Sequence, residues 1–239
     1  MAAAPWSSLF AHNRPALIGV LHLPPLPGSP RWQGDFEAVR RFALADAAAY
    51  LAGGADGLVV ENFGDAPFFA SAVPPHTVAA MARIAAEVVE AAAGVPVGIN
   101  VLRNDSQAAM GIAVASGASF VRVNVLSGAM LTDQGLIEGQ AAELLRLRRQ
   151  LEATEVGIFA DVLVKHAYPL APQPIAEAVE DCLGRAGADG VIVSGVATGA
   201  APDPADLAAA RSSASGAPVL IGSGCHAGNA TSWGPAPMA

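Results

Sequence analysis

Residues 187–195 read Gly-Ala-Asp-Gly-Val-Ile-Val-Ser-Gly, and they carry the pattern that decides the fold. The glycine at position 187 follows an alanine-rich stretch, where a residue that tolerates the left-handed conformation ends a helix. Gly190–Ser194 is then a nearly continuous apolar run, as is typical of a parallel strand covered on both faces. Residues 54–62, Gly-Ala-Asp-Gly-Leu-Val-Val-Glu-Asn, repeat the pattern. The sequence therefore predicts a repeated unit of one strand and one helix.

This unit recurs along the chain without a linker or a break in composition. Apolar runs predict strands, alanine-rich runs predict the helices between them, and a single alternating series indicates a parallel sheet, either doubly wound or closed as a barrel. The predicted strands are Ala16–His22, Gly57–Asn62, Pro96–Leu102, Ser119–Val125, Val156–Val164, Gly190–Ser194 and Pro218–Gly222. The predicted helices are Phe36–Ala52, Pro75–Ala93, Ser106–Ser116, Ile137–Glu152, Ile175–Ala186 and Pro204–Ala214.

Three features favour a barrel over a doubly wound sheet. The number of units is near eight, the polar residues fall at strand ends and in the loops that follow, and no Gly-x-Gly-x-x-Gly opens the first helix. We therefore predict an α/β fold of the TIM (β/α)8 type over residues 1–224, with the eighth βα unit missing. Residues 225–239 predict an irregular tail, because they contain Gly-Asn and Trp-Gly-Pro and no pattern of a strand or a long helix.

The composition excludes several classes of protein. The 239 residues carry a net charge of −8 without a basic stripe, which argues against a nucleic-acid partner. No apolar run approaches the roughly 18–20 residues that span a bilayer, and the first ten residues lack a signal-peptide pattern, so we expect a cytoplasmic protein without an integral membrane segment. Cys182 and Cys225 have no metal-ligand spacing, and Cys182 is expected to be a small buried apolar residue.

One lysine stands alone among the basic residues. Of the 13 basic residues, 12 are arginine, and Lys165 is the remaining one. Such a lysine has either been kept by chance or performs a task that arginine cannot, for example as a titratable amine. A Schiff-base aldolase would use this amine if it were desolvated or placed beside another cation.

Strand parity predicts which polar side chains point in the same direction. Arg122 and Asn124 share one parity in the fourth strand, and Asp161 and Lys165 share one in the fifth. Because charged side chains cannot face an apolar helix layer at tolerable cost, we expect them at the barrel axis near its top. There Asp161 would pair with Arg122 or with Lys165.

The other strand ends complete a candidate site. Barrels often hold phosphate with the loops after strands seven and eight, and small residues let backbone N–H groups approach an anion. Proton transfer by Glu61, Asp161 or His166 on a phosphorylated small molecule is the simplest chemistry, and no cofactor is expected. A metal site of Glu61, Asp161 and His22 is the alternative, but no HxH or HxxE spacing supports it. The candidate catalytic residues are Asp161, Lys165, His166, Glu61 and His22, the substrate-binding residues are Asn100, Arg103, Asn104, Arg122, Asn124, Ser194 and Thr198, and the phosphate-binding residues are Gly222, Ser223 and Gly224.

Structural roles compete with these assignments. His22 could be a core histidine, Glu61 could hold the neighbouring loop, and the Arg122–Asp161 pair could be purely structural. Asp105 or Ser106 is better explained as a helix N-cap than as a catalytic residue. The convergence of polar groups on the interior strand ends favours a functional site.

Several long strings, in order along the chain, are similar to those of a known family. They cover Ile18–Arg31, Asp56–Phe68, Val97–Asp105, Phe120–Val125, Thr132–Gly135, Ala160–His166 and Val193–Gly199. Together they resemble the BtpA/SgcQ family. The resemblance runs from about Pro15 to Gly224, nearly the whole chain, and long ordered strings are far more specific than any one short motif.

The resemblance implies a TIM barrel of the ribulose-phosphate-binding type. Family members are linked to photosystem I biogenesis or lie with sugar-metabolism genes. The resemblance assigns no reaction. The polar strand ends favour an enzyme with isomerase-like or lyase-like chemistry on a phosphorylated or sugar-like metabolite; the alternatives are a non-catalytic photosystem I assembly factor and an inactive, truncated homologue. The family pattern continues after Gly224 with a helix, a strand and a final helix. Their loss would expose two strand edges, which offers a route to a homo-oligomer.

Overall fold

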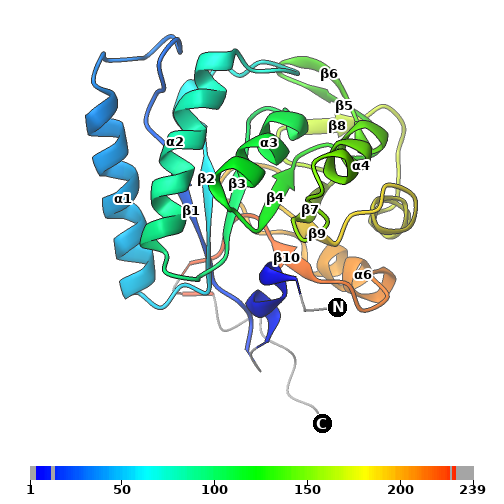
Figure 1. Ribbon diagram of the computed structural model, residues 1–239. Helices are drawn as coiled ribbons and strands as arrows, with labels where there is room; N and C mark the ends of the chain where they lie inside the picture. The colour runs from blue at the N-terminus through cyan, green and yellow to red at the C-terminus, as the bar shows by residue number, and fades with distance from the viewer. Residues whose placement is uncertain (1–3, 12–13, 227, 230–239) are drawn as a thin grey trace.

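A computed structural model describes residues 4–11, 14–226 and 228–229 of the chain (Figure 1). Its centre is a curled sheet of seven parallel strands in the order β1-β2-β3-β4-β7-β9-β10. These strands are β1 (Ile18–His22), β2 (Gly57–Glu61), β3 (Val97–Asn100), β4 (Phe120–Val123), β7 (Gly157–Val162), β9 (Gly190–Val193) and β10 (Val219–Ile221).

Helices cover the outer face of this sheet, as the alternating pattern predicts (Figure 1). Each predicted strand is present, shortened by one or two residues at most ends, and α1 and α3 have the predicted bounds. The helices are α1 (Phe36–Ala52), α2 (Pro75–Ala91), α3 (Ser106–Ser116), α4 (Ala141–Gln150), α5 (Ile175–Glu180), continued by the π-helical turn η3 (Asp181–Arg185), and α6 (Pro204–Ser213).

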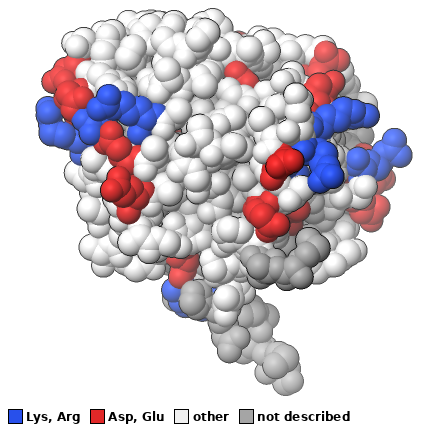
Figure 2. Space-filling view, viewed as in Figure 1, with Lys and Arg blue, Asp and Glu red and all other residues white. Residues whose placement is uncertain are grey.

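Two details of the helix layer match expectation. Asp105 caps α3, because its carboxylate accepts a hydrogen bond from the backbone N–H of Ala108 at 2.9 Å. Cys182 is buried in η3, with 3% of its surface exposed. On the face shown in Figure 2, charged residues gather at the two margins with acidic and basic side chains mixed, and the surface over α3 is uncharged.

The interior of the curled sheet is layered because side chains alternate along each strand. At one level of this interior the side chains are apolar, and the residues two positions further along each strand are polar: Val59 precedes Glu61, Phe120 precedes Arg122, Phe159 precedes Asp161 and Ile192 precedes Ser194. We call the buried cluster Leu9, Val59, Phe120, Phe159 and Ile192 the lower layer, and Glu61, Asn100, Arg122 and Asp161 the upper layer.

A short 3₁₀ helix, η1 (Pro5–Phe10), closes the lower end of this interior. Its Leu9 side chain is fully buried in the lower layer. The Trp6 ring stands edge-on to the Phe159 ring at 5.5 Å between centroids. Gly98 has no Cβ, and one there would clash with the Phe120 ring, so this glycine makes room for an aromatic side chain.

A second, three-stranded antiparallel sheet lies in the loops after β4 and β7. It comprises β5 (Ala129–Thr132), β6 (Gly135–Glu138) and β8 (Ala167–Pro169). The prediction of a helix from Ile137 to Glu152 is therefore wrong at its start: Ile137 lies in β6, and α4 begins only at Ala141. Ile137 is buried under this sheet with Met130, so its apolar character serves a strand pair rather than a helix face.

The parallel sheet ends at β1 on one side and β10 on the other. Within the described residues no strand pairing joins these two edges. The predicted tail, residues 225–239, falls largely outside the described residues, which include only 225, 226, 228 and 229 of it. Among the helices that the structure describes, none has the length and apolarity that crossing a membrane requires.

Candidate functional site

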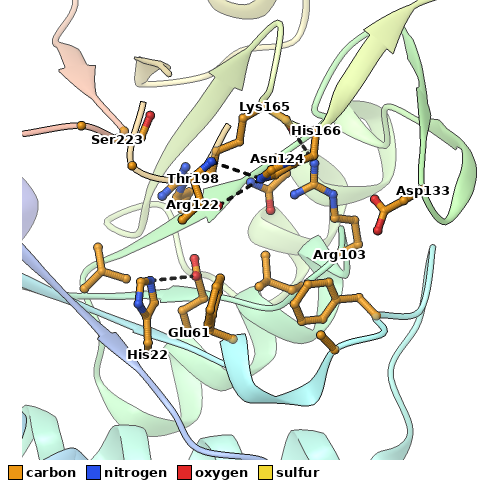
Figure 3. Close-up of a pocket in the computed structure, with 18 of the residues that line it drawn as sticks. His22, Glu61, Arg103, Arg122, Asn124, Asp133, Lys165, His166, Thr198 and Ser223 are labelled. Carbon is orange, nitrogen blue, oxygen red and sulfur yellow. Dashed lines mark hydrogen bonds and ion pairs between the residues drawn. The ribbon is translucent and has the colours of Figure 1, made fainter. Parts of the chain in front are cut away.

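A cavity of about 550 Å³ opens at the carboxyl ends of the parallel strands (Figure 3). Its walls come from the strands β1, β2 and β4, from the loops that follow β1, β2, β3, β4, β7, β9 and β10, and from the β5–β6 turn. The residues that line it are Val20, His22, Arg31, Glu61, Phe63, Ala66, Phe68, Leu102, Arg103, Arg122, Asn124, Asp133, Lys165, His166, Thr198, Gly199, Gly222, Ser223 and Gly224.

One wall carries a histidine–carboxylate pair. His22 Nε2 lies 3.3 Å from Glu61 Oε1, and the Asn100 side chain donates a hydrogen bond of 2.6 Å to the other oxygen of the same carboxylate. The His22 ring stacks on Phe63 at 4.4 Å between centroids. Half of the His22 side chain is exposed, while Glu61 and Asn100 are buried, so a buried carboxylate orients an imidazole that faces the cavity.

The electrostatics of Glu61 follow from its partners. Burial alone would raise the pKa of this carboxyl group, but the hydrogen bond with His22 and the positive charge of Arg122 lower it below its ordinary value. Glu61 is thus a fixed anion at neutral pH. An imidazole held by such an anion is the arrangement of a general base and its orienting group.

The opposite wall is built around a buried ion pair. The Arg122 guanidinium donates two hydrogen bonds to Asp161, from Nε and Nη2, both at 2.9 Å. Asn124 and Ser194 donate further hydrogen bonds to the same carboxylate at 2.9 and 3.3 Å. Burial alone would lower the pKa of Arg122, but the contact with Asp161 raises it above its ordinary value. Asp161 therefore pairs with Arg122, one of the two partners predicted for it.

Lys165 lies on this same side of the cavity, near Arg122 (Figure 3). Its backbone carbonyl accepts a 2.6 Å hydrogen bond from Nη2 of Arg103. Among the interactions of the described residues, none holds its ammonium group in a hydrogen bond or an ion pair. Burial, followed by the positive charge of Arg122, lowers the pKa of Lys165.

His166 and Thr198 close the upper edge of this wall. The backbone N–H of Thr198 donates to Nε2 of His166 at 3.2 Å, and the Thr198 hydroxyl lies 3.0 Å from the same nitrogen. A nitrogen that accepts from a backbone N–H carries no proton, which places the proton of the neutral ring on Nδ1. His166 has a positive φ of 56°, a strained conformation for a residue other than glycine, and it lines the cavity.

The Gly222-Ser223-Gly224 turn forms the cavity wall beside Arg122. A Cβ at Gly222 would lie 3.2 Å from Nη2 of Arg122, so the glycine lets the guanidinium approach the backbone. The Ser223 hydroxyl donates to the carbonyl of Ala200 and accepts from the N–H of Gly195, and it thereby joins two loops. In the described part of the chain, no hydrogen bond uses the backbone N–H of Ser223 or Gly224.

The charge inside the cavity is opposite to that of the chain. The whole chain carries −8. The lining contains four cations, Arg31, Arg103, Arg122 and Lys165, against two carboxylates, Glu61 and Asp133. Even with the buried Asp161 counted beside Arg122, cations exceed anions.

Most of the residues predicted for the site lie in this cavity or directly beneath it. Asp161, Asn100 and Ser194 do not line it, but they hold Arg122 and Glu61 in place. Asn104 is different, because both atoms of its amide bond the backbone of Val125, at 2.8 and 2.9 Å, away from the lining. His22 is not a core histidine, because half of its side chain is exposed. The Glu61 carboxylate contacts the side chains of His22 and Asn100 rather than the backbone of a loop.

Sequence reasoning missed several lining residues. Phe63 and Phe68 follow β2, and the charged Arg31 and Asp133 come from the loop after β1 and the β5–β6 turn. Arg31 and Asp133 lie in the strings that carry the family resemblance, which was the available signal. Asn62 is buried and supports the third loop, because its side-chain oxygen accepts from the N–H of Leu102 at 2.7 Å. Among the described residues no cluster of three or more His, Cys, Asp or Glu has the geometry of a metal site.

Solved structures with a similar fold are enzymes of low sequence identity. A crystal structure of 2,3-dimethylmalate lyase, a member of the PEP mutase/isocitrate lyase superfamily, matches with a TM-score of 0.56 at 13% identity, over 97% of this chain and 76% of the other. Dihydropteroate synthase of Xanthomonas albilineans matches with a TM-score of 0.50 at 20% identity, over 87% and 71%. At these identities the likeness shows the fold alone.

Sequence relatives are much closer. The photosystem I biogenesis protein BtpA of Synechocystis is 53% identical over 91% of this chain and 75% of its own length. An uncharacterised protein of Pyrococcus furiosus is 46% identical over 91% and 80%. The sequence profile of the BtpA family matches residues 13–234. The chain therefore belongs to the BtpA family.

Proposed function

We propose that the chain is an enzyme that binds a small phosphorylated or sugar-like metabolite in this cavity and converts it by proton transfer. The carrying observation is the excess of cations in the lining of a chain whose net charge is −8. Such a cavity concentrates anions against the field of the whole protein. The Gly222-Ser223-Gly224 turn beside Arg122 suits the phosphate group, as in barrels of the ribulose-phosphate-binding type.

The other wall supplies the acid–base chemistry of this proposal. His22 would take a proton from the bound metabolite, and Glu61 would stabilise the imidazolium that forms. The two groups lie across the cavity from Arg122 and Lys165 (Figure 3). A ligand that places its anionic end near Arg122 would therefore present its carbon skeleton to His22, as an isomerase-like or lyase-like reaction requires.

A ligand panel tests this function. Sugar phosphates and the same unphosphorylated sugars are screened by thermal shift, and hits are measured by calorimetry. We expect phosphorylated compounds to raise the Tm and their parent sugars to do so less. A failure of every sugar phosphate at millimolar concentration would contradict the proposal.

A matched pair of variants locates the binding. Lys165→Gln removes one positive charge from the cavity, and Arg185→Gln removes one from an exposed side chain on η3. Both change the net charge by the same amount. We expect sugar-phosphate affinity to fall about tenfold or more in the first variant, since a lost charge-assisted contact is worth roughly 1.5–3 kcal/mol, and to stay unchanged in the second. Equal effects would indicate long-range attraction without a site.

A second candidate function, in photosystem I biogenesis, is favoured by the identity to the Synechocystis relative and by one surface. Leu131 of β5 is paired with Leu136 of β6 on one side and Tyr168 of β8 on the other, so the three side chains form one row. They are 53%, 50% and 76% exposed. An exposed apolar row of this kind suits a protein partner. Leu131→Ser with Tyr168→Ser should abolish co-purification with photosystem subunits and leave sugar-phosphate binding intact; recovery of no such subunit by the native chain would contradict this role.

A further inference from the structure

We propose that Lys165 forms a covalent Schiff base with a ligand that carries an aldehyde or ketone group next to an anionic group. This rests on the proposed function, because the same cavity must first bind the anionic end. It adds the substrate class, a carbonyl compound, and a covalent step that proton transfer alone does not need.

The first argument is the position of the amine. Lys165 lines the cavity near Arg122 and opposite His22 and Glu61 (Figure 3). No carboxylate among the described residues is paired with it: Asp161 is occupied by Arg122, and Glu61 by His22 and Asn100. A lysine that served only to balance a carboxylate would be paired. This one faces open cavity volume.

The second argument is the support of its backbone. Arg103 is buried and donates to the carbonyl of Lys165, and it thereby fixes the main chain from which the amine extends. Positive φ values at Leu163 and His166, on either side, hold the same segment in an uncommon conformation. Arg103 is thus a positioning residue for Lys165, and it adds a second cation beside Arg122.

The third argument is chemical. Only a neutral amine attacks a carbonyl carbon, and burial together with the charge of Arg122 lowers the pKa of Lys165, which raises the neutral fraction at physiological pH. Arginine lacks this chemistry, so the single lysine among 13 basic residues stands where its amine has a use.

The step balances without an oxidant or reductant. The lysine nitrogen forms a bond to the carbonyl carbon, and the carbonyl oxygen takes one proton from the amine and one from solvent and leaves as water. The product is a protonated imine. Its positive charge makes a C–H bond on the neighbouring carbon more acidic, and His22 across the cavity is the base that would take that proton.

Reductive trapping tests the proposal on the whole chain. Glycolaldehyde phosphate and pyridoxal 5′-phosphate serve as probes, sodium cyanoborohydride reduces any imine, and peptide mass spectrometry maps the adduct. The native chain should carry an adduct at Lys165, which peptide mapping distinguishes from any adduct at the α-amino group of the chain. Lys165→Arg keeps the charge and should lose that adduct.

An internal control measures ordinary amine reactivity. Arg185→Lys introduces an amine at a side chain that is 86% exposed. In this variant we expect the cavity amine to be trapped faster than the surface amine at neutral pH, because its pKa is lowered and each unit of lowering raises the neutral fraction about tenfold. The rate at Lys165 should also level off at a lower pH than the rate at the surface amine.

The outcomes separate the two proposals. Equal trapping at both amines, or no adduct at Lys165 with either probe, would overturn the Schiff base. If the probes nevertheless bind by calorimetry, the proposed sugar-phosphate function survives and Lys165 acts as a simple cation. If glycolaldehyde and its phosphate are trapped at equal rates, the imine stands and the anion preference of the cavity fails.

Discussion

The lower and upper layers of the sheet interior are built by the same strands, yet they have opposite chemistry. In the lower layer, Leu9, Phe120 and Phe159 fill space without any polar group. Two residues further along the strands, Arg122 and Asp161 are buried as a charged pair with additional hydrogen bonds. The lower layer stabilises the fold through apolar packing, whereas burying the charged pair of the upper layer costs desolvation energy, and the proposed ligand binding would account for that cost.

The largest expected effect comes from breaking the upper ion pair. Asp161→Ala leaves the Arg122 guanidinium buried without its carboxylate, which should lower the free energy of unfolding by about 3–5 kcal/mol in urea denaturation. Replacing both partners, Arg122→Met with Asp161→Leu, should recover most of this loss and abolish sugar-phosphate binding. A double variant as unstable as Asp161→Ala would show that the pair itself stabilises the fold.

A change in the lower layer should lower stability without changing the affinity for a sugar phosphate. Leu9→Ala removes a fully buried side chain from η1 and should cost about 2–5 kcal/mol of stability through the cavity it leaves. Because Leu9 belongs to the lower layer and does not line the cavity, the Kd for a sugar phosphate should not change. A weaker affinity at a temperature where the variant is folded would refute the separation of the two layers.

Substitutions at two glycines, Gly98 beside the lower layer and Gly111 in α3, should have smaller and opposite effects on stability. A methyl group at Gly98 would clash with the Phe120 ring in the lower layer, so Gly98→Ala should cost about 1–3 kcal/mol. Gly111 of α3 has open space around its Cβ position. Gly111→Ala should therefore stabilise the chain by up to about 1 kcal/mol, because alanine is the better helix former. Thermal denaturation of both variants measures the contrast.

Strand periodicity predicted this layering in part. The apolar runs located every parallel strand, and parity placed Arg122 and Asp161 on the interior side, because both signals are local. Periodicity failed at Ile137, where a short apolar segment packs under a hairpin. Nothing local distinguishes such a segment from the first turn of a helix.

For the candidate site too, the sequence predicted residues whose position depends on local pattern and missed those whose position depends on how distant segments pack. Strand ends predicted Glu61, Lys165 and Gly222, since parallel strands bring their carboxyl ends together. The contribution of Asp133 depends on how the β5–β6 turn folds over the cavity, which no spacing encodes. Asn104 was predicted to bind substrate, but it clamps the Val125 backbone, because an amide suits either task equally well.

The last expected effect is a pH dependence that arises from one amine in the cavity, that of Lys165. The pKa of Lys165 is lowered in the folded state, so between that lowered value and about 10.4 the unfolded chain binds more protons than the folded one. Stability at this site therefore rises with pH across that window and is least below it. Lys165→Met removes the titration, so the native chain should gain stability relative to this variant as the pH is raised from 7 to 10, by about 1.4 kcal/mol for each unit by which the pKa of Lys165 is lowered.

Leu9→Ala is the control, since its loss of stability should be the same at every pH. A stability difference between the native chain and Lys165→Met that stays constant over this range would mean that the amine is as well solvated in the folded protein as in the unfolded chain, and the argument for its reactivity would lose its electrostatic support.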